Sequence, residues 1–593
     1  MNNISTNKII NYIGLVLLIA VVPLLMKLNT QAVTPSLQLY FGTEAVDIFI
    51  NKKVQWFLVT TCIVGIYNIL NVLIVGDSYE FMSEKIKNPI TIGSLLIVVM
   101  AIVSLIFSSY KDIVFAGAPG RSESIFVMLG YLMSITFPII FLKSQKDISW
   151  VMVPLLISSL IIGAIGAFQY LFYDIVISDG FSKYYLGDQY GTTKVGAAFT
   201  SSYSTLYNPN YLGQYTSMLI PLCGAILVGF KNKFIKLLSL LNIILLAIAL
   251  IGSESETGAL ALCGTIGIMF IMECVYSLKN GRKTRGIVLL VAIVLMPIVF
   301  IISILLNPTL NKNFNRVLSN SLYTDNFFVS LDYNENSVMI ENKFGMHTFV
   351  FENNTFDFID ETGTMLIEDC EFKEGYMLSA ETSNNVMVDI TLGAEKLIGY
   401  KAEGTDLLFV PDGNNTKFIG SGGESVDIHN KVPSIGFKNY QGFASNRGYI
   451  WSKSLPMVLD TLLIGNGSNT FIKEFPQYDV EGKLIYYKDP RIVVDKPHNV
   501  LISYSVNTGF LSLVGYLILL GFSIYLNIRE YLKSADLYNR CLHLGLIAFI
   551  ASYFINGFAT DQNINVSPVF FVMLGFSYAI VYIKKDKKWF WVK

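Results

Sequence analysis

The sequence predicts an all-α polytopic membrane protein with about 12 transmembrane helices and an inserted extracellular β-rich domain. Three observations lead to this fold class. Hydrophobic residues make up 53% of the 593-residue chain, and only 15% of its residues are charged. A soluble globular chain carries about 25% charged residues. In addition, long apolar runs flank a single polar region in which apolar and polar residues alternate.

The transmembrane helices are predicted from apolar runs of about 20 residues, the length that crosses the hydrocarbon core of a bilayer. The first run is too long for the core of a signal peptide, and no small-residue cleavage site follows it, so we expect an uncleaved helix. The predicted spans are 9–28, 54–76, 89–109, 124–143, 150–172, 206–229, 236–252, 257–276, 286–306, 499–527, 542–560 and 566–583.

The orientation is predicted from Lys and Arg in the short loops, because these residues concentrate on the cytoplasmic side of a membrane. Basic residues gather in alternate loops, for example at 279–285 and 529–540, and again in the C-terminal tail. We therefore expect a protein of the cytoplasmic membrane with both termini in the cytoplasm and residues 307–497 outside. The net charge of −1 gives no sign of nucleic-acid binding.

The chain is expected to divide into four units. These are a membrane domain at 1–306, an extracellular β-rich insertion at 320–435, an extracellular membrane-surface helical segment at 436–497, and a second membrane domain at 498–593. In the insertion, "HTFVFE" and "TFDFID" alternate around an Asn-Asn pair, "VMVDITL" places four apolar residues on one face, and "LLFV" and "KFIG" flank the turn "PDGNN". Such short strands with dense turns predict hairpins in a sandwich or a curled sheet.

Residues 436–497 lack this alternation. The stretch "RGYIWSKSLPMVLDTLLIG" carries Trp451, Leu455, Val458, Leu459 and Leu462 at helical spacing, which predicts an amphipathic helix. We expect it to lie along the membrane surface.

Cysteine and histidine patterns give no sign of a metal or cofactor. Only Cys370, of six cysteines, lies in the outer region, so it has no partner there for a disulfide. The chain contains no CxxC, no HExxH and no clustered histidines. A zinc site is therefore not expected.

The strongest functional pattern lies at 447–509, which reads "NRGYIW", then "LLIGNGSNTF", then "KPHNVLISYSVNTG". An Arg, a Trp four residues on, a Gly-rich turn, a Pro-His-Asn and a Gly eleven residues after the His resemble the bacterial O-antigen ligase/polymerase family. "APGRSESIFVMLGYL" and "NPNYLGQYTSMLIPL" are weaker matches to the family's Gly-Arg-x-Glu segment and its Asn-Pro-Asn helix start. The resemblance covers the membrane portion and 440–510, but not the insertion.

One segment departs from the family pattern. Many members have Ser-Arg-Gly at the helix start that here reads "SESETGALAL", with Glu256 and Gly258 but no Arg. A substrate contact made there in other members must be absent or replaced. Glu254 and Glu256 are themselves expected simply as acids at a helix start.

Four arginines fall in the predicted outer segments, and none of them lies inside the β alternation. A guanidinium presents a rigid fork of donors that matches phosphate oxygens, whereas pairing with acids is the ordinary alternative. We expect Arg447, Arg121 and Arg491 to bind a lipid diphosphate, with Arg316 the weakest candidate. Glu123 and Asn499 complete the predicted substrate-binding set, and the alternative for Glu123 is a solvated loop acid.

His498 is the predicted catalytic residue. A neutral imidazole accepts protons near pH 6.5, and Pro497 favours a helix start at which a first-turn His would face the substrate. Free N–H groups at that helix start would also help to hold an anion. The alternative is an interfacial histidine that pairs with a carboxylate. His347 and His429 are expected to be surface or core residues of the insertion, and His543 is expected near the cytoplasmic face.

The resemblance implies a metal-independent, inverting glycosyltransferase that acts on the outer face. It would move glycan from an undecaprenyl-diphosphate donor to an acceptor hydroxyl, as a surface-polysaccharide polymerase or as a ligase. A flippase and a chain-length regulator are the protein partners that this function implies, beside the bilayer. The insertion is expected to influence acceptor choice or product length without doing chemistry.

Two other classes remain open from the residues alone. A lipid-linked glycan flippase or transporter would show repeats and interrupted helices. A metal-dependent oligosaccharyltransferase would carry paired acids in the first outer loop, where this chain has only Glu44 and Asp47.

Overall fold

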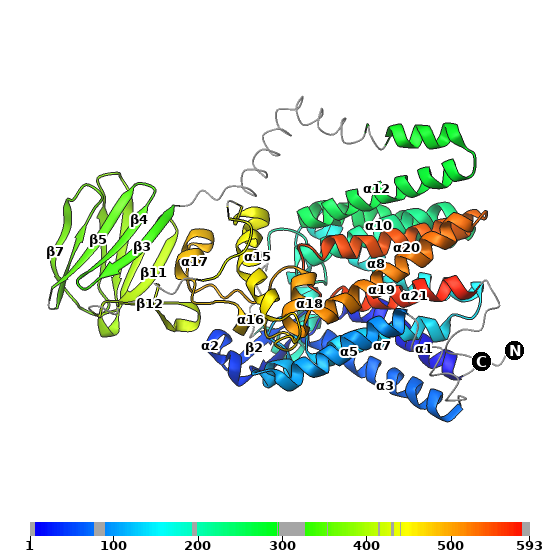
Figure 1. Ribbon diagram of the computed structural model, residues 1–593, viewed down its shortest axis with the longest axis horizontal. Coiled ribbons are helices and arrows are strands. Elements are labelled where there is room, and N and C mark those ends of the chain that lie inside the picture. Colours follow the sequence, from blue (N-terminus) through cyan, green and yellow to red (C-terminus); the bar gives the residue numbers. More distant parts are fainter. Residues whose placement is uncertain are drawn as a thin grey trace.

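The computed structural model describes residues 6–75, 89–191, 199–292, 295, 327–352, 354–412, 416–428, 432–438 and 440–583. Figure 1 shows a body of helices with a β domain at one end. Short helices lie between these two parts, and α1 and α21 extend away from the β domain. The molecule is therefore mostly helical, with a separate β-sheet region.

The apolar runs form the long helices of the body. Within the described residues, nine helical segments are long and apolar enough to cross a membrane, and two shorter helices are also apolar. The helices are α1 (Thr6–Val16), α3 (Asn51–Val75), α5 (Pro89–Phe107), α7 (Ile125–Phe141), α8 (Gln145–Leu171), α10 (Pro209–Gly229), α11 (Lys233–Ser253), α12 (Glu256–Lys279), α19 (Phe510–Lys533), α20 (Leu537–Asn556) and α21 (Ser567–Ile583). The protein is thus a multi-pass membrane protein, and most of the predicted span 286–306 lies outside the described residues.

The Asn-Pro-Asn segment begins the buried helix α10, as its sequence predicts. The side chain of Asn208 accepts a hydrogen bond from the backbone N–H of Asn210, and Pro209 occupies the first helical position. This arrangement suits proline because the first helical N–H has no partner inside the helix. Further along, Gly213 lies directly against Gly258 of α12, where a Cβ atom on Gly258 would come within 2.7 Å of the Gly213 backbone.

The predicted span 499–527 is in fact two helices, α18 (Val500–Thr508) and α19. Gly509 lies between them with a φ of +94°, a conformation that L side chains rarely adopt. A Cβ atom at this position would also lie 3.2 Å from the backbone nitrogen of Gly465. The glycine therefore ends α18 and lets the chain turn into α19 beside the 465–470 loop.

The β domain contains two antiparallel sheets in which, among the described strands, neighbours in sequence are neighbours in space. Their buried side chains form one core. The first sheet holds β3 (Phe328–Asn334), β4 (Ser337–Asn342), β5 (Gly345–Glu352), β6 (Thr355–Ile359) and β7 (Met365–Glu371). The second holds β8 (Met377–Glu381), β9 (Met387–Leu392), β10 (Ile398–Ala402), β11 (Thr405–Val410), β12 (Lys417–Ile419) and β13 (Ser425–Val426).

The strand pairings confirm the predicted hairpins. Glu352 of β5 pairs with Thr355 of β6, and Phe409 of β11 pairs with Phe418 of β12. The alternating residues of β9, such as Val388 and Ile390, point into the core between the sheets. The period-2 pattern therefore located these strands correctly, because one face of each sheet is buried.

The segment between the β domain and the second membrane domain contains α15 (Phe443–Asp460), α16 (Phe471–Glu474) and α17 (Val480–Tyr487). A helix is confirmed in the predicted stretch as α15, although it ends at Asp460, and its buried residues, such as Tyr449 and Ile450, are not those of the predicted apolar face. Residues 444–446 have positive φ, so its regular right-handed part begins at Arg447. The side chains of Leu459, Leu462 and Leu463 near its end are exposed. Contact of these residues with a membrane surface stays a prediction.

The β domain takes part of its core from α17, which the predicted division at residue 435 assigns to a different unit. Val480 and Leu484 are buried in the same cluster as the strand residues. Lys483 is also buried and donates hydrogen bonds to Ser421 Oγ and to the backbone oxygen of Gln477, the latter at 2.6 Å. Burial lowers the pKa of Lys483 to about 7. The insertion is therefore not independent of the segment that follows it.

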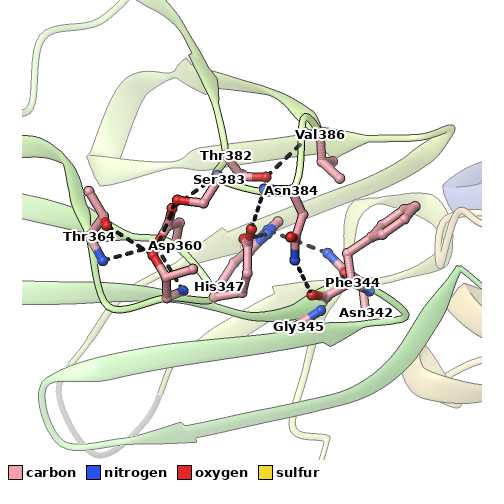
Figure 2. Close-up of polar contacts among 12 residues, drawn as sticks. Asn342, Phe344, Gly345, His347, Asp360, Thr364, Thr382, Ser383, Asn384 and Val386 are labelled. Atoms are coloured by element: carbon pink, nitrogen blue, oxygen red, sulfur yellow. Dashed lines mark hydrogen bonds and ion pairs between the residues drawn. The ribbon is translucent and has the colours of Figure 1, made fainter.

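His347 is a core residue that joins the two sheets, which is one of the two positions predicted for it from the sequence. It lies fully buried on β5, with Nδ1 2.9 Å from the hydroxyl oxygen of Tyr400 on β10 and Nε2 3.2 Å from a carboxylate oxygen of Glu361. Figure 2 shows the polar contacts around it, in which Asn384 donates to the backbone oxygen of Phe344 at 2.7 Å. His429 lies outside the described residues.

The stability of the β domain should fall as the pH drops below about 6.5. Burial lowers the pKa of His347 from its ordinary value of 6.5, and Glu361 opposes that shift. The unfolded chain then binds a proton at a pH where the folded domain does not, so acid favours unfolding. Hydrogen exchange of β5 and β10 in the full-length protein, corrected for intrinsic rates, should show this loss between pH 7.5 and 5.5.

The matched variant is His347→Gln, which removes the titrating group but keeps hydrogen-bonding capacity. Its β domain should lose less protection over the same pH range. An equal loss in both proteins would show that another group causes the acid sensitivity.

Candidate active site

Three segments from distant parts of the sequence meet where the helical body faces the short helices. They are the loop before α7, the stretch 495–499 before α18, and the turn between α20 and α21. Arg121 from the first segment donates a hydrogen bond to the backbone oxygen of Asp495 in the second at 3.1 Å. The same side chain lies 3.8 Å from the carboxylate of Asp561 in the third. Arg121 therefore contacts both other segments.

His498 lies at the centre of this meeting point in a left-handed backbone conformation. Its φ is +48°, which is uncommon for a residue with a side chain. The indole N–H of Trp451 on α15 donates to the backbone oxygen of the preceding Pro497 at 2.9 Å. The Trp and the His of the sequence pattern are thus linked in the structure, because Trp451 holds the backbone directly before His498. Strained backbone of this kind is typical of functional sites.

Asn499 is the N-cap of α18, and its contacts are structural. Its side-chain oxygen accepts hydrogen bonds from the N–H groups of Leu501 and Ile502, and its amide nitrogen donates to the backbone oxygen of Phe558. The N–H of Val500 donates to Gly557 at 2.7 Å. The expectation of free N–H groups at this helix start is therefore wrong, and His498 precedes the cap rather than lying in the first turn.

The key contact joins His498 to Asp561. Nδ1 of His498 lies 3.2 Å from Oδ2 of Asp561, with the His side chain 32% exposed and the Asp side chain 1% exposed. A buried carboxylate is costly unless charges or donors compensate it. Here the imidazole and the guanidinium of Arg121 provide that compensation.

The charges around the pair set its protonation state. Burial lowers the pKa of His498, while Asp561 opposes this shift. Burial would raise the pKa of Asp561, but His498, Arg121 and Lys496 hold it well below its usual value. At neutral pH the site therefore contains a carboxylate beside a neutral imidazole. Within the described residues neither carboxylate oxygen of Asp561 has a hydrogen-bond partner, so the 3.2 Å approach of Nδ1 is an electrostatic contact. The tautomer with its proton on Nδ1 would leave the lone pair on Nε2.

Arg447 begins the regular part of α15 and retains unused hydrogen-bonding capacity. Its Nη1 donates to the backbone oxygen of Ala444 at 3.1 Å. Its Nε is buried and, within the described part of the chain, has no hydrogen-bond partner. Burial lowers the pKa of Arg447, and the negative charges of Asp561 and Glu256 oppose that shift. An anion at this position would supply the missing acceptor.

Arg491 lies apart from this group. Its guanidinium is 2.7 Å from Asp406 of β11 and 2.9 Å from Asp489. The structure therefore places Arg491 in a contact between the β domain and the chain beyond α17, where both neighbours are acids. The predicted fourth outer arginine, Arg316, lies outside the described residues.

Glu123 lies two residues after Arg121 and is half-buried. It accepts a hydrogen bond from the hydroxyl of Tyr131 at 2.9 Å, and burial raises its pKa to about 8. Its contact with Tyr131 distinguishes it from a freely solvated loop acid, and a role in binding substrate stays a prediction. Glu123, Arg121 and Gln562 line two neighbouring pockets, with about 430 and 200 Å³ of empty space, part of it open to solvent.

Sequence reasoning missed Asp561 and Lys496. The signal for the first was "TDQNIN", a polar run at 560–565 between two apolar helices. In the structure Thr560, Asp561 and Asn565 of this run are buried. A mostly polar turn that is buried rather than solvated indicates a functional or structural polar site. Lys496 adjoins the family-like Pro-His-Asn, and its charge was not considered there.

In the described part of the chain, no group of three or more His, Cys, Asp or Glu side chains is arranged to hold a metal ion. No protein-family model matches the sequence, and no curated protein matches it.

The pKa of His498 should be below 6.5 and should respond to its neighbours in opposite directions. Asp561→Asn removes the charge that favours the imidazolium, so the pKa of His498 should fall further. Lys496→Met removes a positive charge, so the pKa should rise. NMR of protein labelled at histidine, with the signal assigned by His498→Gln, measures both shifts. A rise in the Asp561→Asn protein would contradict the pairing.

Proposed function

We propose that this protein transfers glycan from an undecaprenyl-diphosphate donor to an acceptor hydroxyl at the outer face of the cytoplasmic membrane. The observation that carries the proposal is the contact of His498 with buried Asp561, next to Arg121, Lys496 and Arg447. A base beside several cations suits a reaction that activates a hydroxyl and releases an anion. The motif resemblance at 447–509 supports the same reaction.

In the proposed reaction, the acceptor hydroxyl approaches Nε2 of His498. The oxygen attacks the anomeric carbon of the donor sugar, and its proton moves to Nε2. The new C–O bond forms as the bond between the anomeric carbon and the phosphate oxygen breaks, so the anomeric centre inverts. Asp561, whose carboxylate lies 3.2 Å from Nδ1, stabilises the imidazolium that forms, as a carboxylate does in other His-Asp pairs.

The diphosphate leaves with its negative charge, which the cations stabilise. Arg447 has a buried Nε without a partner among the described residues, and Arg121 lies within the same group. Preorganised donors aimed at a developing charge account for much of the rate enhancement in many enzymes. The orientation implied by the basic loops puts the site outside and the termini in the cytoplasm. Polymerase and ligase would share this chemistry and differ in the acceptor.

Two other functions make different demands on the site. A glycan flippase needs a path for the headgroup, but no base paired with a carboxylate, and it would form no glycosidic bond. A metal-dependent transferase needs carboxylates that attract a divalent ion, whereas here the buried Asp561 already has cationic neighbours. Loss of activity on chelation, with recovery in Mg²⁺ or Mn²⁺, would favour the metal-dependent enzyme.

Removal of either member of the His-Asp pair should impair transfer. His498→Ala should lower the rate about 100-fold or more, since a general base contributes on that scale. Asp561→Asn should also lower the rate, and the double variant should be no slower than His498→Ala because the two act as a unit. The assay is glycan transfer from purified lipid-linked donor in nanodiscs, with thermal unfolding as the check on folding.

The arginines offer a matched pair of variants. Arg447→Lys keeps the charge but loses the planar fork, so transfer should fall about tenfold or more. Arg491→Lys, in the contact with Asp406 and Asp489, should leave the rate within about twofold of wild type. If both substitutions lowered the transfer rate equally, the proposal that Arg447 binds the diphosphate would be wrong.

A further inference from the structure

The larger pocket beside Arg121 is lined mainly by polar side chains, most of which have no role in the proposed reaction of His498 and Asp561. Its walls come from α18, from the 465–470 loop, and from the residues around Glu123 and Gln562. Its empty space is about 430 Å³, which includes its open mouth.

Glycines let the loop approach α18 closely enough to form this wall. The N–H of Asn466 donates to the backbone oxygen of Val506 at 3.0 Å, and that of Gly467 donates to Asn507 at 2.7 Å. A Cβ atom on Gly465 would come within 2.4 Å of the backbone nitrogen of Thr508. The Gly-rich turn of the sequence therefore serves to place the next two residues, Ser468 and Asn469, against the pocket.

Several polar atoms at this wall are buried without a partner. Ser468 and Asn469 are 4% and 3% exposed, and both line the pocket. Among the described residues, Ser468 Oγ, Asn469 Nδ2 and Asn507 Oδ1 have no hydrogen-bond partner. Leaving such groups unpaired costs free energy, so their presence at a pocket indicates a ligand that pairs with them.

The chemistry of these atoms indicates a neutral polyhydroxyl ligand. Asn469 Nδ2 is a donor, Asn507 Oδ1 is an acceptor, and Ser468 Oγ can be either. A phosphate offers only acceptors and would leave the Asn507 oxygen unpaired, whereas each sugar hydroxyl both donates and accepts. Glu123, whose pKa is raised by desolvation, lines the same pocket and adds a carboxyl group that can hydrogen-bond to a hydroxyl. Met128 gives one apolar contact surface.

We propose that this pocket binds one pyranose ring of the glycan through Ser468, Asn469 and Asn507. The assignment rests on the proposed glycosyl transfer and deepens it, because Arg121 lines the pocket and also lies 3.8 Å from Asp561. A ring held there is adjacent to the cationic group and to the His-Asp pair. The ring belongs either to the lipid-linked donor or to the acceptor glycan.

Binding measurements test this assignment without relying on catalysis. The probes are citronellyl diphosphate and citronellyl-diphosphate sugars that carry glucose, galactose or N-acetylglucosamine, titrated into the full-length protein in nanodiscs. At least one sugar-bearing probe should bind about threefold to tenfold more tightly than the sugar-free lipid, as expected for one or two added hydrogen bonds. Soluble methyl glycosides form a second arm, and their binding would assign the ring to the acceptor.

The matched variants are Ser468→Ala with Asn507→Ala, and Ser505→Ala as the control. Ser505 is a buried serine of α18 that donates to Leu501 and does not line the pocket. The double variant should lose the sugar-dependent gain and keep the affinity for sugar-free lipid, while the control keeps both.

The outcomes distinguish failure of the proposed sugar site from failure of the proposed reaction. A gain that persists in the double variant, or no gain with any sugar in either arm, would overturn the assignment. His498→Ala should retain the gain, because it removes the base and not the pocket. A wild-type protein that shows the gain but forms no glycosidic bond would contradict the proposed reaction and leave the sugar site standing.

Discussion

The burial of the Asp561 carboxylate is the constraint on which the arrangement of the site depends. The side chain is 1% exposed, and a lone carboxylate in such a place would be strongly destabilising or would take up a proton. His498 and Arg121 make it tolerable, at 3.2 and 3.8 Å from its oxygens. These three residues come from three distant segments. The contacts of His498 and Arg121 with Asp561 therefore keep the aspartate ionised and also join the segments before α7 and α18 to the α20–α21 turn. Burial keeps the imidazole neutral at neutral pH, although the nearby Asp561 opposes this effect.

The surrounding backbone is arranged to hold that imidazole. Trp451 donates to Pro497 on one side of His498, and Asn499 caps α18 and contacts Phe558 on the other. Between them His498 keeps a left-handed φ that it would rarely adopt alone. Gly509 then ends α18 after little more than two turns, so the helix that begins at the site stays short and the 465–470 loop can pack beside it. One set of close contacts thus positions His498 and forms the wall of the adjoining pocket.

The β domain is connected to this same stretch of chain. Val480 and Leu484 of α17 complete its core, and Asp406 of β11 pairs with Arg491, seven residues before His498. The backbone N–H of Asp406 also donates to the backbone oxygen of Lys488 at 2.9 Å. A domain that shares a core and an ion pair with residues 480–491 is coupled to the segment that carries His498. Its proposed influence on acceptor choice therefore has a physical route that an independent domain on a flexible loop would lack.

The sequence by itself determined the membrane character of the chain and its β region, because hydropathy, period-2 alternation and helix-start residues are local properties. It located the β5–β6 and β11–β12 hairpins and the start of α10 for the same reason. Only the tertiary structure decided which charged residues meet. Asp561 and His498 are 63 positions apart, Arg121 and Asp561 are 440 apart, and no local pattern encodes such contacts. The separate location of Arg491, the capping role of Asn499 and the sharing of α17 with the β domain are likewise consequences of packing between distant segments.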